Sequence, residues 1–319
     1  MEILPEKEYE TVLVVLDEVD FCTLFARCVL VGHAAGVVFA SPVQNKESQR
    51  LFYICSHYGM TLLCGAHPGD CSHDVLRWLQ EHLFPSDSAA SPKRTYMEWL
   101  QVSPTKPWSQ FIHSLASALS PSSSSSFSPP SLESFSSERV NYSFSSSTPS
   151  SCPSPRMILD SFQARMVLID GDLFDRISGS VAPRLFWRDR DTWTKYGGLG
   201  YCILATCEVA GETQEMPVCW SFSSVLIGDR LEIGIETVKE YQGKGLAMLV
   251  AHALIALCRQ MQLTPIWTCR RSNIASCRLA ASLGFVESVV PSSPLPYFHL
   301  PFLAAPLDQD FRLISNSST

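Results

Sequence analysis

Residues 231–247 read LEIGIETVKEYQGKGLA, the segment with the clearest structural pattern in the chain. Its first eight residues alternate between the two faces of an extended chain, which predicts a β-strand with Glu232 and Glu236 on one face. A turn containing Gly243 and Gly245 follows. From Leu246 onward apolar residues recur at steps of three and four, which predicts an amphipathic helix. The stretch therefore predicts a strand, a glycine-rich turn and a helix in direct succession.

Such a unit can hold a phosphate group at the start of its helix. The first backbone N–H groups of a helix are unpaired and lie at the positive end of its dipole, and glycines let an anion approach them closely. Lys244 adds a positive charge. Two other phosphate motifs do not fit, because Met248 replaces the third glycine of a dinucleotide pattern and Gly245 replaces the Ser or Thr of a P-loop. A strand–turn–helix with ordinary glycines stays the alternative.

The segment 242–247, Gln-Gly-Lys-Gly-Leu-Ala, resembles the acetyl-CoA signature of the GNAT superfamily of N-acetyltransferases, Gln/Arg-x-x-Gly-x-Gly/Ala. A second block is also similar to that family, with Asn273, Ser276 and then Leu-Gly-Phe at 283–285. Residues 198–285 carry the resemblance most strongly. Within the superfamily, the chain looks like the two-domain branch that is similar to zwittermicin A resistance acetyltransferases.

The resemblance implies an acetyl-CoA site. The backbone amides of residues 242–247 would hold the pyrophosphate, and the main chain near Val238 would pair with the pantetheine arm and polarise the thioester carbonyl. Asn273 and Ser276 would lie beside the same arm. The implied cofactor-binding residues are Val238, Gln242, Gly243, Lys244, Gly245, Leu246, Ala247, Asn273 and Ser276.

The implied reaction is direct attack of an amine on the acetyl group, without a covalent enzyme intermediate and without a metal. An amine with a pKa near 10.4 must first lose a proton, which costs about 4.6 kcal/mol at pH 7. Glu232 and Glu236 are the candidate bases, with Glu232 slightly favoured. Where many members of the family carry a tyrosine that protonates the leaving thiolate, this chain has Ala280. Tyr297, Cys277 or water would supply that proton, or the thiolate leaves unassisted.

Two other functions fit the same residues. One is a glycine N-acyltransferase-like enzyme that transfers a longer acyl group. The other is a non-catalytic CoA-binding module that regulates a partner, a reading that Ala280 and the serine-rich segment favour. The sequence encodes neither the identity of the amine acceptor, which we expect to be a small molecule, nor the oligomeric state.

The rest of the chain predicts an α/β protein, a mixed α+β sheet with helices on its faces. We expect a smaller N-terminal α/β domain at 1–113, a serine-rich disordered linker at 114–155, and the acetyltransferase domain at 156–319. Serine supplies 20 of the 41 residues from Ser114 to Ser154, a composition that cannot bury a core. The histidine- and cysteine-containing loop at 67–73 fits no metal-ligand spacing, and we expect no metal.

The composition narrows the function classes further. A net charge of −7 argues against binding to nucleic acid or to anionic membranes. The sequence contains neither a secretory signal nor a run of about 18 apolar residues that could span a membrane. We therefore expect a cytoplasmic enzyme whose 12 cysteines are reduced thiols.

Overall fold

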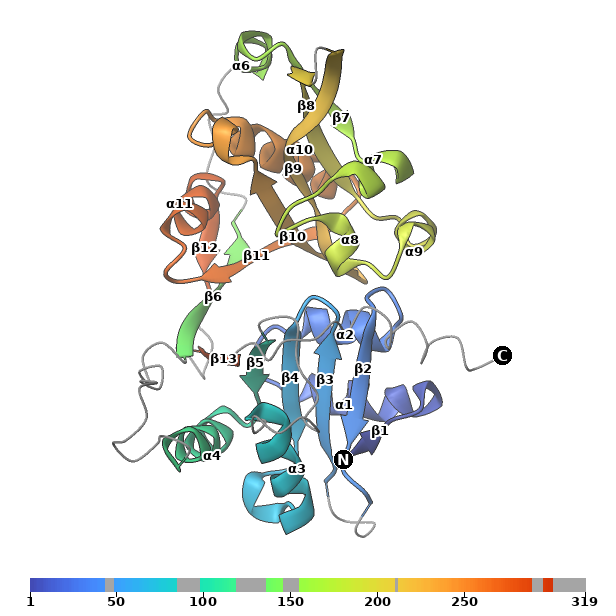
Figure 1. Ribbon diagram of the computed structural model, residues 1–319, viewed down its shortest axis with the longest axis vertical. Coiled ribbons are helices and arrows are strands. Elements are labelled where there is room, and N and C mark those ends of the chain that lie inside the picture. The colour runs from blue at the N-terminus through green and yellow to red at the C-terminus, as the bar shows by residue number, and fades with distance from the viewer. Residues whose placement is uncertain are drawn as a thin grey trace. The chain divides into compact units, whose positions relative to one another are not determined.

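The computed structural model describes residues 1–43, 49–84, 98–118, 136–145, 155–209, 212–288 and 295–300. The chain forms two units (Figure 1). The first contains residues 1–31, 35–139 and 290–319, and the second contains residues 32–34 and 140–289.

The first unit is a mixed sheet with helices packed on it. Its strands lie in the order β1-β2-β3-β4-β5-β13-β6; β4 and β5 run parallel, and the other neighbours run antiparallel. The strands are β1 (Glu2–Ile3), β2 (Gly36–Ala40), β3 (Leu51–Ser56), β4 (Met60–Gly65), β5 (Glu98–Val102), β6 (Ser136–Phe144) and β13 (Leu295–Leu300). The helices are η1 (Glu6–Glu8), α1 (Tyr9–Asp17), α2 (Leu24–Leu30), η2 (Pro68–Asp70), α3 (His73–Leu83) and α4 (Thr105–Ala118).

The core of this unit lies between the sheet and helices α3 and α4. Tyr53, Leu79 and Trp108 are buried in one cluster, and the Trp108 indole N–H donates to the carbonyl of Ala66 at 3.0 Å. In the loop at 67–73, the ring of His67 accepts from the amide of Gly69 at 3.2 Å. Among the described residues, no group of three or more His, Cys, Asp or Glu side chains is arranged to hold a metal ion.

The second unit is a mixed sheet with helices on both faces. Its strands lie in the order β7-β8-β9-β10-β11-β6, and β12 also pairs with β6. The strands are β7 (Ala164–Leu168), β8 (Gly200–Val209), β9 (Glu212–Ile227), β10 (Arg230–Thr237), β11 (Thr264–Arg270) and β12 (Phe285–Glu287), besides β6. The helices are α6 (Pro155–Ser161), α7 (Gly171–Arg176), α8 (Pro183–Phe186), α9 (Arg190–Lys195), η3 (Lys239–Tyr241), α10 (Leu246–Gln260) and α11 (Ile274–Ser282).

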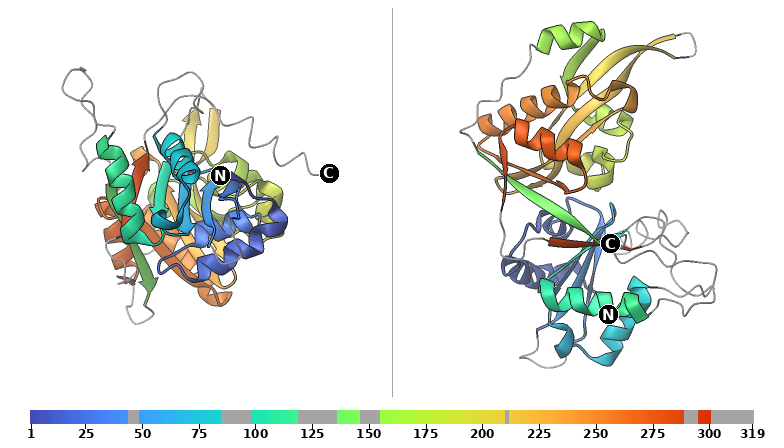
Figure 2. Two further views of the ribbon diagram at one scale, coloured as in Figure 1. Left: turned by 90° about the horizontal axis from the view of Figure 1, so that it is seen from below. Right: turned by 90° about the vertical axis from the view of Figure 1, so that its left-hand side faces the viewer.

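Alternation along the strands determines which helix covers which face of this sheet. Leu231 and Ile233 of β10 face α10, with which they share a buried cluster. Trp220 and Phe222 of β9 face the opposite way and are buried against α7, α8 and α9. Helices α10 and α11 therefore cover one face and the three short helices cover the other (Figure 2). The predicted mixed α/β fold is confirmed, as is the predicted succession of strand, turn and helix.

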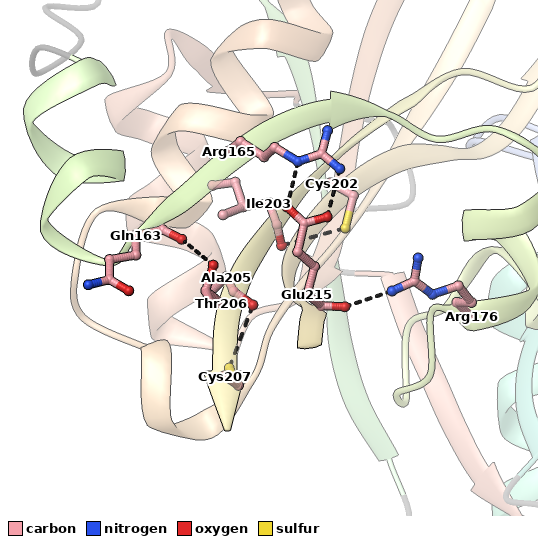
Figure 3. Close-up of polar contacts among 9 residues, drawn as sticks. All are labelled: Gln163, Arg165, Arg176, Cys202, Ile203, Ala205, Thr206, Cys207 and Glu215. Carbon is pink, nitrogen blue, oxygen red and sulfur yellow. Dashed lines mark hydrogen bonds and ion pairs between the residues drawn. The ribbon is translucent and has the colours of Figure 1, made fainter. Parts of the chain in front are cut away.

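The outer edge of the second unit carries an exposed ion pair. Arg165 of β7 donates to both carboxylate oxygens of Glu215 on β9, at 2.6 and 2.7 Å, across the intervening strand β8 (Figure 3). Arg176 donates to the carbonyl of Glu215 at 2.7 Å. The hydrogen bond from Arg165 holds the pKa of the Glu215 carboxyl below its ordinary value. The bonds of Glu215 to Arg165 and Arg176 connect β7 and α7 to β9 at the surface.

The structure corrects the prediction of a disordered linker at 114–155 in two places. Residues up to Ala118 complete α4, and Ser136–Phe144 form β6, the strand between β11 and β12. The reason is that Val140 and Tyr142 alternate with polar residues and are buried in the core of the second unit. The average composition of the segment concealed this pattern. The rest of the predicted linker lies outside the described residues.

The predicted C-terminal domain, 156–319, also differs from the observed second unit. Strand β13 pairs with β5 and β6 in the first unit, so the chain returns to that unit after β12. Conversely, β6 precedes the predicted domain in sequence but contributes to its sheet. No described helix is long and apolar enough to cross a membrane.

A glycine-to-alanine pair tests the packing of the second unit. A Cβ at Gly198 would overlap the ring of the buried Trp193. We expect Gly198→Ala to lower the free energy of unfolding by roughly 1–3 kcal/mol. The control, Gly69→Ala, places its Cβ 3.4 Å from the nearest side-chain atom at an exposed position and should change stability by less than about 0.5 kcal/mol. Equal effects in chemical denaturation would contradict this packing.

Candidate active site

The candidate site begins where β10 parts from one of its neighbours. On one side, β10 pairs with β9 over eight residues, from Arg230 to Thr237. On the other side, it pairs in parallel with β11 over three residues only, and Glu232 opposite Ile266 is the last pair. Among the described residues, no strand continues that ladder beyond Glu232. The second half of β10 therefore has an unpaired backbone edge inside the sheet.

The register of β9 and β10 shows which backbone groups line this edge. The amide of Val238 donates to the carbonyl of Val218, beyond the end of β9–β10 pairing, at 2.9 Å. Hydrogen-bonded pairs alternate along an antiparallel ladder, and the register is regular from Ile233 to Thr237. The amides of Ile235 and Thr237 consequently point away from β9, toward the side where β11 has separated.

The assignment of the main chain near Val238 to a cofactor stays a prediction, but the N–H group of Val238 itself is committed to Val218 and is not a free donor. The nearby amides that point to the open side, those of Ile235 and Thr237, were not identified from the sequence. Their role depends on which residues of β9 lie opposite them, and the sequence of β10 alone carries no signal for that register.

The glycine-rich turn leads directly into α10 and leaves a row of amides without acceptors. Gly243 and Gly245 have φ angles of +72° and +81°, in the left-handed region that glycine adopts without strain. Gly245 is the N-cap of α10, and no side chain caps the helix. The first amide of the helix with an acceptor is that of Leu249, which donates to the Gly245 carbonyl at 3.3 Å. Among the described residues, the amides from 243 to 247 find no partner outside the helix.

Gln242 has a different role from the one predicted for its amide. Its N–H group donates to the carbonyl of Lys239 at 3.3 Å, and its side chain donates to the carbonyl of Thr237 at 3.0 Å. Gln242 therefore braces the turn against the end of β10. The row of free amides therefore begins after Gln242, at residue 243. Residues 242–245 are exposed, so no described side chain fills the turn.

Lys244 lies against two aromatic rings beside this turn. Its ammonium nitrogen is 5.1 Å from the ring centre of Phe162 and 5.2 Å from that of Tyr241, within cation–π range. The Tyr241 hydroxyl contacts the Cys207 sulfur at 3.4 Å, and this hydrogen bond raises the pKa of Tyr241. The positive charge is thus held next to the free amides.

The two predicted carboxylates lie on the same face of β10 but have different surroundings. Glu236 accepts three hydrogen bonds from the loop between α7 and α8: from the amide of Val181 at 2.7 Å, and from the hydroxyl and amide of Ser180 at 3.0 and 3.2 Å. A Cβ at Gly179 would overlap this carboxylate. Glu236 therefore positions the loop.

Glu232 lies where β10 and β11 begin to separate. Its carboxylate accepts a hydrogen bond from the hydroxyl of Thr268 at 2.5 Å. Thr268 is two residues beyond the last β11 residue that pairs with β10, and both side chains are half-buried. A carboxylate at the base of the separated strands can accept a proton from a group bound between them.

The predicted residues downstream of β11 have local structural partners. The Asn273 side chain caps α11 by accepting from the amide of Ser276 at 3.1 Å, and the Ser276 hydroxyl accepts from the indole N–H of Trp267 at 3.0 Å. Ala280 is fully buried in the core. Tyr297, one of the candidate acids, belongs to β13 of the first unit, and its side chain lies outside the described part of the chain.

Comparison with known proteins places this chain in a family. The sequence profile of the GNAT acetyltransferases matches residues 19–289. The chain belongs to the GNAT acetyltransferase family. The uncharacterized N-acetyltransferase YdfB of Bacillus subtilis (strain 168) is 37% identical over 89 residues, which are 28% of this chain and 31% of that protein. This match therefore spans about a third of the length of the curated relative.

A solved structure shares the fold over most of its length. A GCN5-related N-acetyltransferase-like protein from Streptococcus suis superposes with a TM-score of 0.57 at 18% identity, covering 92% of this chain and 99% of that one. A GNAT-family acetyltransferase from Colwellia psychrerythraea gives a TM-score of 0.48 at 12% identity, covering 94% and 99%. The superposition with the Streptococcus suis protein supports the fold assignment, and at 18% identity it supports the fold alone.

The bonding of Glu236 predicts a stability effect. In Glu236→Gln, an NH₂ group replaces one acceptor oxygen and faces the N–H donors of the loop. We expect the free energy of unfolding to fall by about 1–3 kcal/mol and protease cleavage near residues 178–182 to become faster. The control Glu240→Gln removes the same charge at an exposed position. If both variants unfold at the same denaturant concentration, Glu236 does not anchor the loop.

Proposed function

We propose that this protein is an N-acetyltransferase that moves an acetyl group from acetyl-CoA to an amine of a small molecule, within a ternary complex. Two groups of backbone amides that have no partner among the described residues support the proposal. One group is Ile235 and Thr237 on the unpaired edge of β10, and the other is residues 243–247 in the turn before α10. A long thioester cofactor with a diphosphate at its other end suits two such groups.

The turn before α10 suits a diphosphate. The amides of Gly243, Lys244, Gly245, Leu246 and Ala247 offer donors at the positive end of a 15-residue helix. A Cβ at Gly243 would meet nothing within 4 Å, so there is open space over the turn. The ammonium group of Lys244 adds charge beside it. Members of the GNAT family generally use acetyl-CoA, whose diphosphate these groups would bind.

The edge of β10 suits the thioester end of the same molecule. We assign the amide of Ile235 to the thioester carbonyl, where a fixed N–H donor stabilises the negative charge that develops as the amine attacks. The amide of Thr237 would pair with the pantetheine arm. Asn273 and Ser276 stay assigned to the neighbourhood of this arm through the start of α11.

Glu232 is the proposed general base. The loop that Glu236 holds, residues 179–181, lies over the face of β10 that carries Glu232, and we place the amine acceptor on this face. Removal of its proton avoids the cost of about 4.6 kcal/mol that an amine with a pKa near 10.4 carries at pH 7. Glu236 acts as a positioning residue, because its carboxylate is already bonded to three donors.

The leaving thiolate would take its proton from water. Ala280 is buried and offers no proton, and the sulfur of Cys277 contacts that of Cys269 at 3.6 Å. A thiol with a pKa near 8.5 can leave as its anion. Within the GNAT family, residues 198–202, 232–237 and 265–269 resemble the two-domain branch similar to zwittermicin A resistance acetyltransferases, and this likeness supports placing the protein in that branch.

A pair of substitutions at Gly245 tests the diphosphate site. Asp and Asn have the same shape and both tolerate the left-handed conformation, and a Cβ here makes only an ordinary contact with Ile158 at 3.5 Å. Gly245→Asp places a negative charge among the free amides. We expect it to bind acetyl-CoA at least about tenfold more weakly than Gly245→Asn in calorimetric titration. Equal affinities of the two variants would contradict the site.

The proposed base makes a prediction about pH. We expect Glu232→Gln to lower kcat with an acceptor amine by about 10²–10⁴-fold at pH 7. The loss should shrink as the pH rises toward the amine pKa near 10.4, because neutral amine is then present without a base. The acetyl-CoA affinity of this variant should not change. A defect that is the same at every pH would argue against a proton-transfer role.

A further inference from the structure

Two thiols of the second unit lie in contact at the junction of β11 and α11. The sulfur of Cys269, near the end of β11, is 3.6 Å from the sulfur of Cys277 in the first half of α11. The two residues are eight positions apart in the chain. Neither sulfur has a role in the proposed acetyl transfer.

The surrounding structure holds the two sulfurs together. The amide of Asn273 donates to the carbonyl of Arg270 at 2.9 Å, which closes the turn between β11 and α11. The hydrogen bond from Trp267 to Ser276 ties the first turn of α11 to β11, two residues before Cys269 on β11 and one residue before Cys277 on α11. The pair is therefore a property of the folded turn and does not depend on a chance approach of two flexible side chains.

The two thiols also differ in exposure. Cys269 is buried, whereas Cys277 is half-buried and can be reached from solvent. The phenol of Tyr142 on β6 is hydrogen-bonded to Cys277, and burial raises the pKa of that phenol. Elsewhere in the second unit, burial raises the thiol pKa values of Cys202 and Cys219 to about 12, so these two thiols are poor nucleophiles.

We propose that Cys269 and Cys277 form an oxidation site at which a peroxide makes a reversible disulfide. The sulfur of Cys277 first attacks one oxygen of hydrogen peroxide. An S–O bond forms, the O–O bond breaks, and water leaves, which gives a sulfenic acid on Cys277. The sulfur of Cys269 then attacks that of Cys277. The S–S bond forms, the S–O bond breaks, and the hydroxide leaves as water with the proton of the Cys269 thiol.

The balance is two thiols and one peroxide giving one disulfide and two water molecules. The sulfurs must approach from 3.6 Å to the disulfide length of roughly 2 Å, which rotation of the Cys277 side chain can supply. The closed loop contains Asn273 and Ser276, so oxidation fixes the segment that begins α11.

Peptide mapping of the full-length protein tests this site directly. Trypsin cleaves after Arg259, Arg270, Arg271 and Arg278, so Cys269 and Cys277 fall on the separate peptides 260–270 and 272–278, each with one cysteine. After treatment with hydrogen peroxide and blocking of free thiols, we expect these two peptides to be linked, with a mass two hydrogens below their sum. A dithiol reductant should release them.

Variants and internal controls make the test specific. Cys277→Ser and Cys269→Ser should each abolish the linked pair, and Cys71→Ser, at another half-buried thiol, should leave it unchanged. Cys202 and Cys219, which lie together with Cys207 on the tryptic peptide 196–230, should stay reduced under the same treatment. The proposal is overturned if Cys277 is oxidised to sulfinic acid without any linked peptide, or if 260–270 and 272–278 are linked no more often than other cysteine peptides.

Discussion

Strand β10 is paired along its length on one side and only at its start on the other, and the proposed site depends on this asymmetry. The ladder with β9 fixes the conformation of β10 over eight residues. The ladder with β11 stops at Glu232. Inside a sheet, an unpaired edge costs free energy unless its donors and acceptors find partners. An extended ligand that adds to this edge would provide them.

The helix that follows extends the same principle. The turn at 243–247 ends with Gly245 as the N-cap of α10 and without a side chain to satisfy the first amides. Most helices meet this need with Ser, Thr, Asp or Asn at that position. Here the Gln242 side chain ties the turn to the carbonyl of Thr237, while the amides from 243 to 247 have no partner among the described residues. Rigid, unsatisfied donors are the requirement for binding an anion without reorganisation.

The two glutamates on β10 show how position decides chemical role. Glu236 is bonded to three donors of one loop, and its work is to hold that loop. Glu232 lies at the base of the separation and accepts from Thr268 of β11. Both residues are glutamates, and both lie on the same face of β10. Only the neighbours that the fold brings to each carboxylate distinguish the proposed base, Glu232, from Glu236, which holds the loop.

The sequence predicts the structural features that depend on neighbouring residues in the chain. It does not predict those that depend on contacts between distant residues. The strand, the turn and the helix from 231 to 260 follow from periodicity and glycine placement, and the structure contains them. The free amides of Ile235 and Thr237 depend on the register with β9, and the commitment of Val238 depends on Val218. Strand β6 was missed because Val140 and Tyr142 lie in a serine-rich segment, and their burial depends on residues more than a hundred positions away.

We propose that backbone amides of β10 and of the turn before α10 bind one extended ligand. Backbone ¹H–¹⁵N NMR spectra of the deuterated protein, recorded with and without CoA, would show whether these amides contact the ligand. We expect the amides of Ile235, Thr237 and residues 243–247 to show the largest shifts, while that of Val238, already bonded to Val218, shifts less. If CoA binds and these amides do not move, or if the protein shows no response to CoA, the account is wrong.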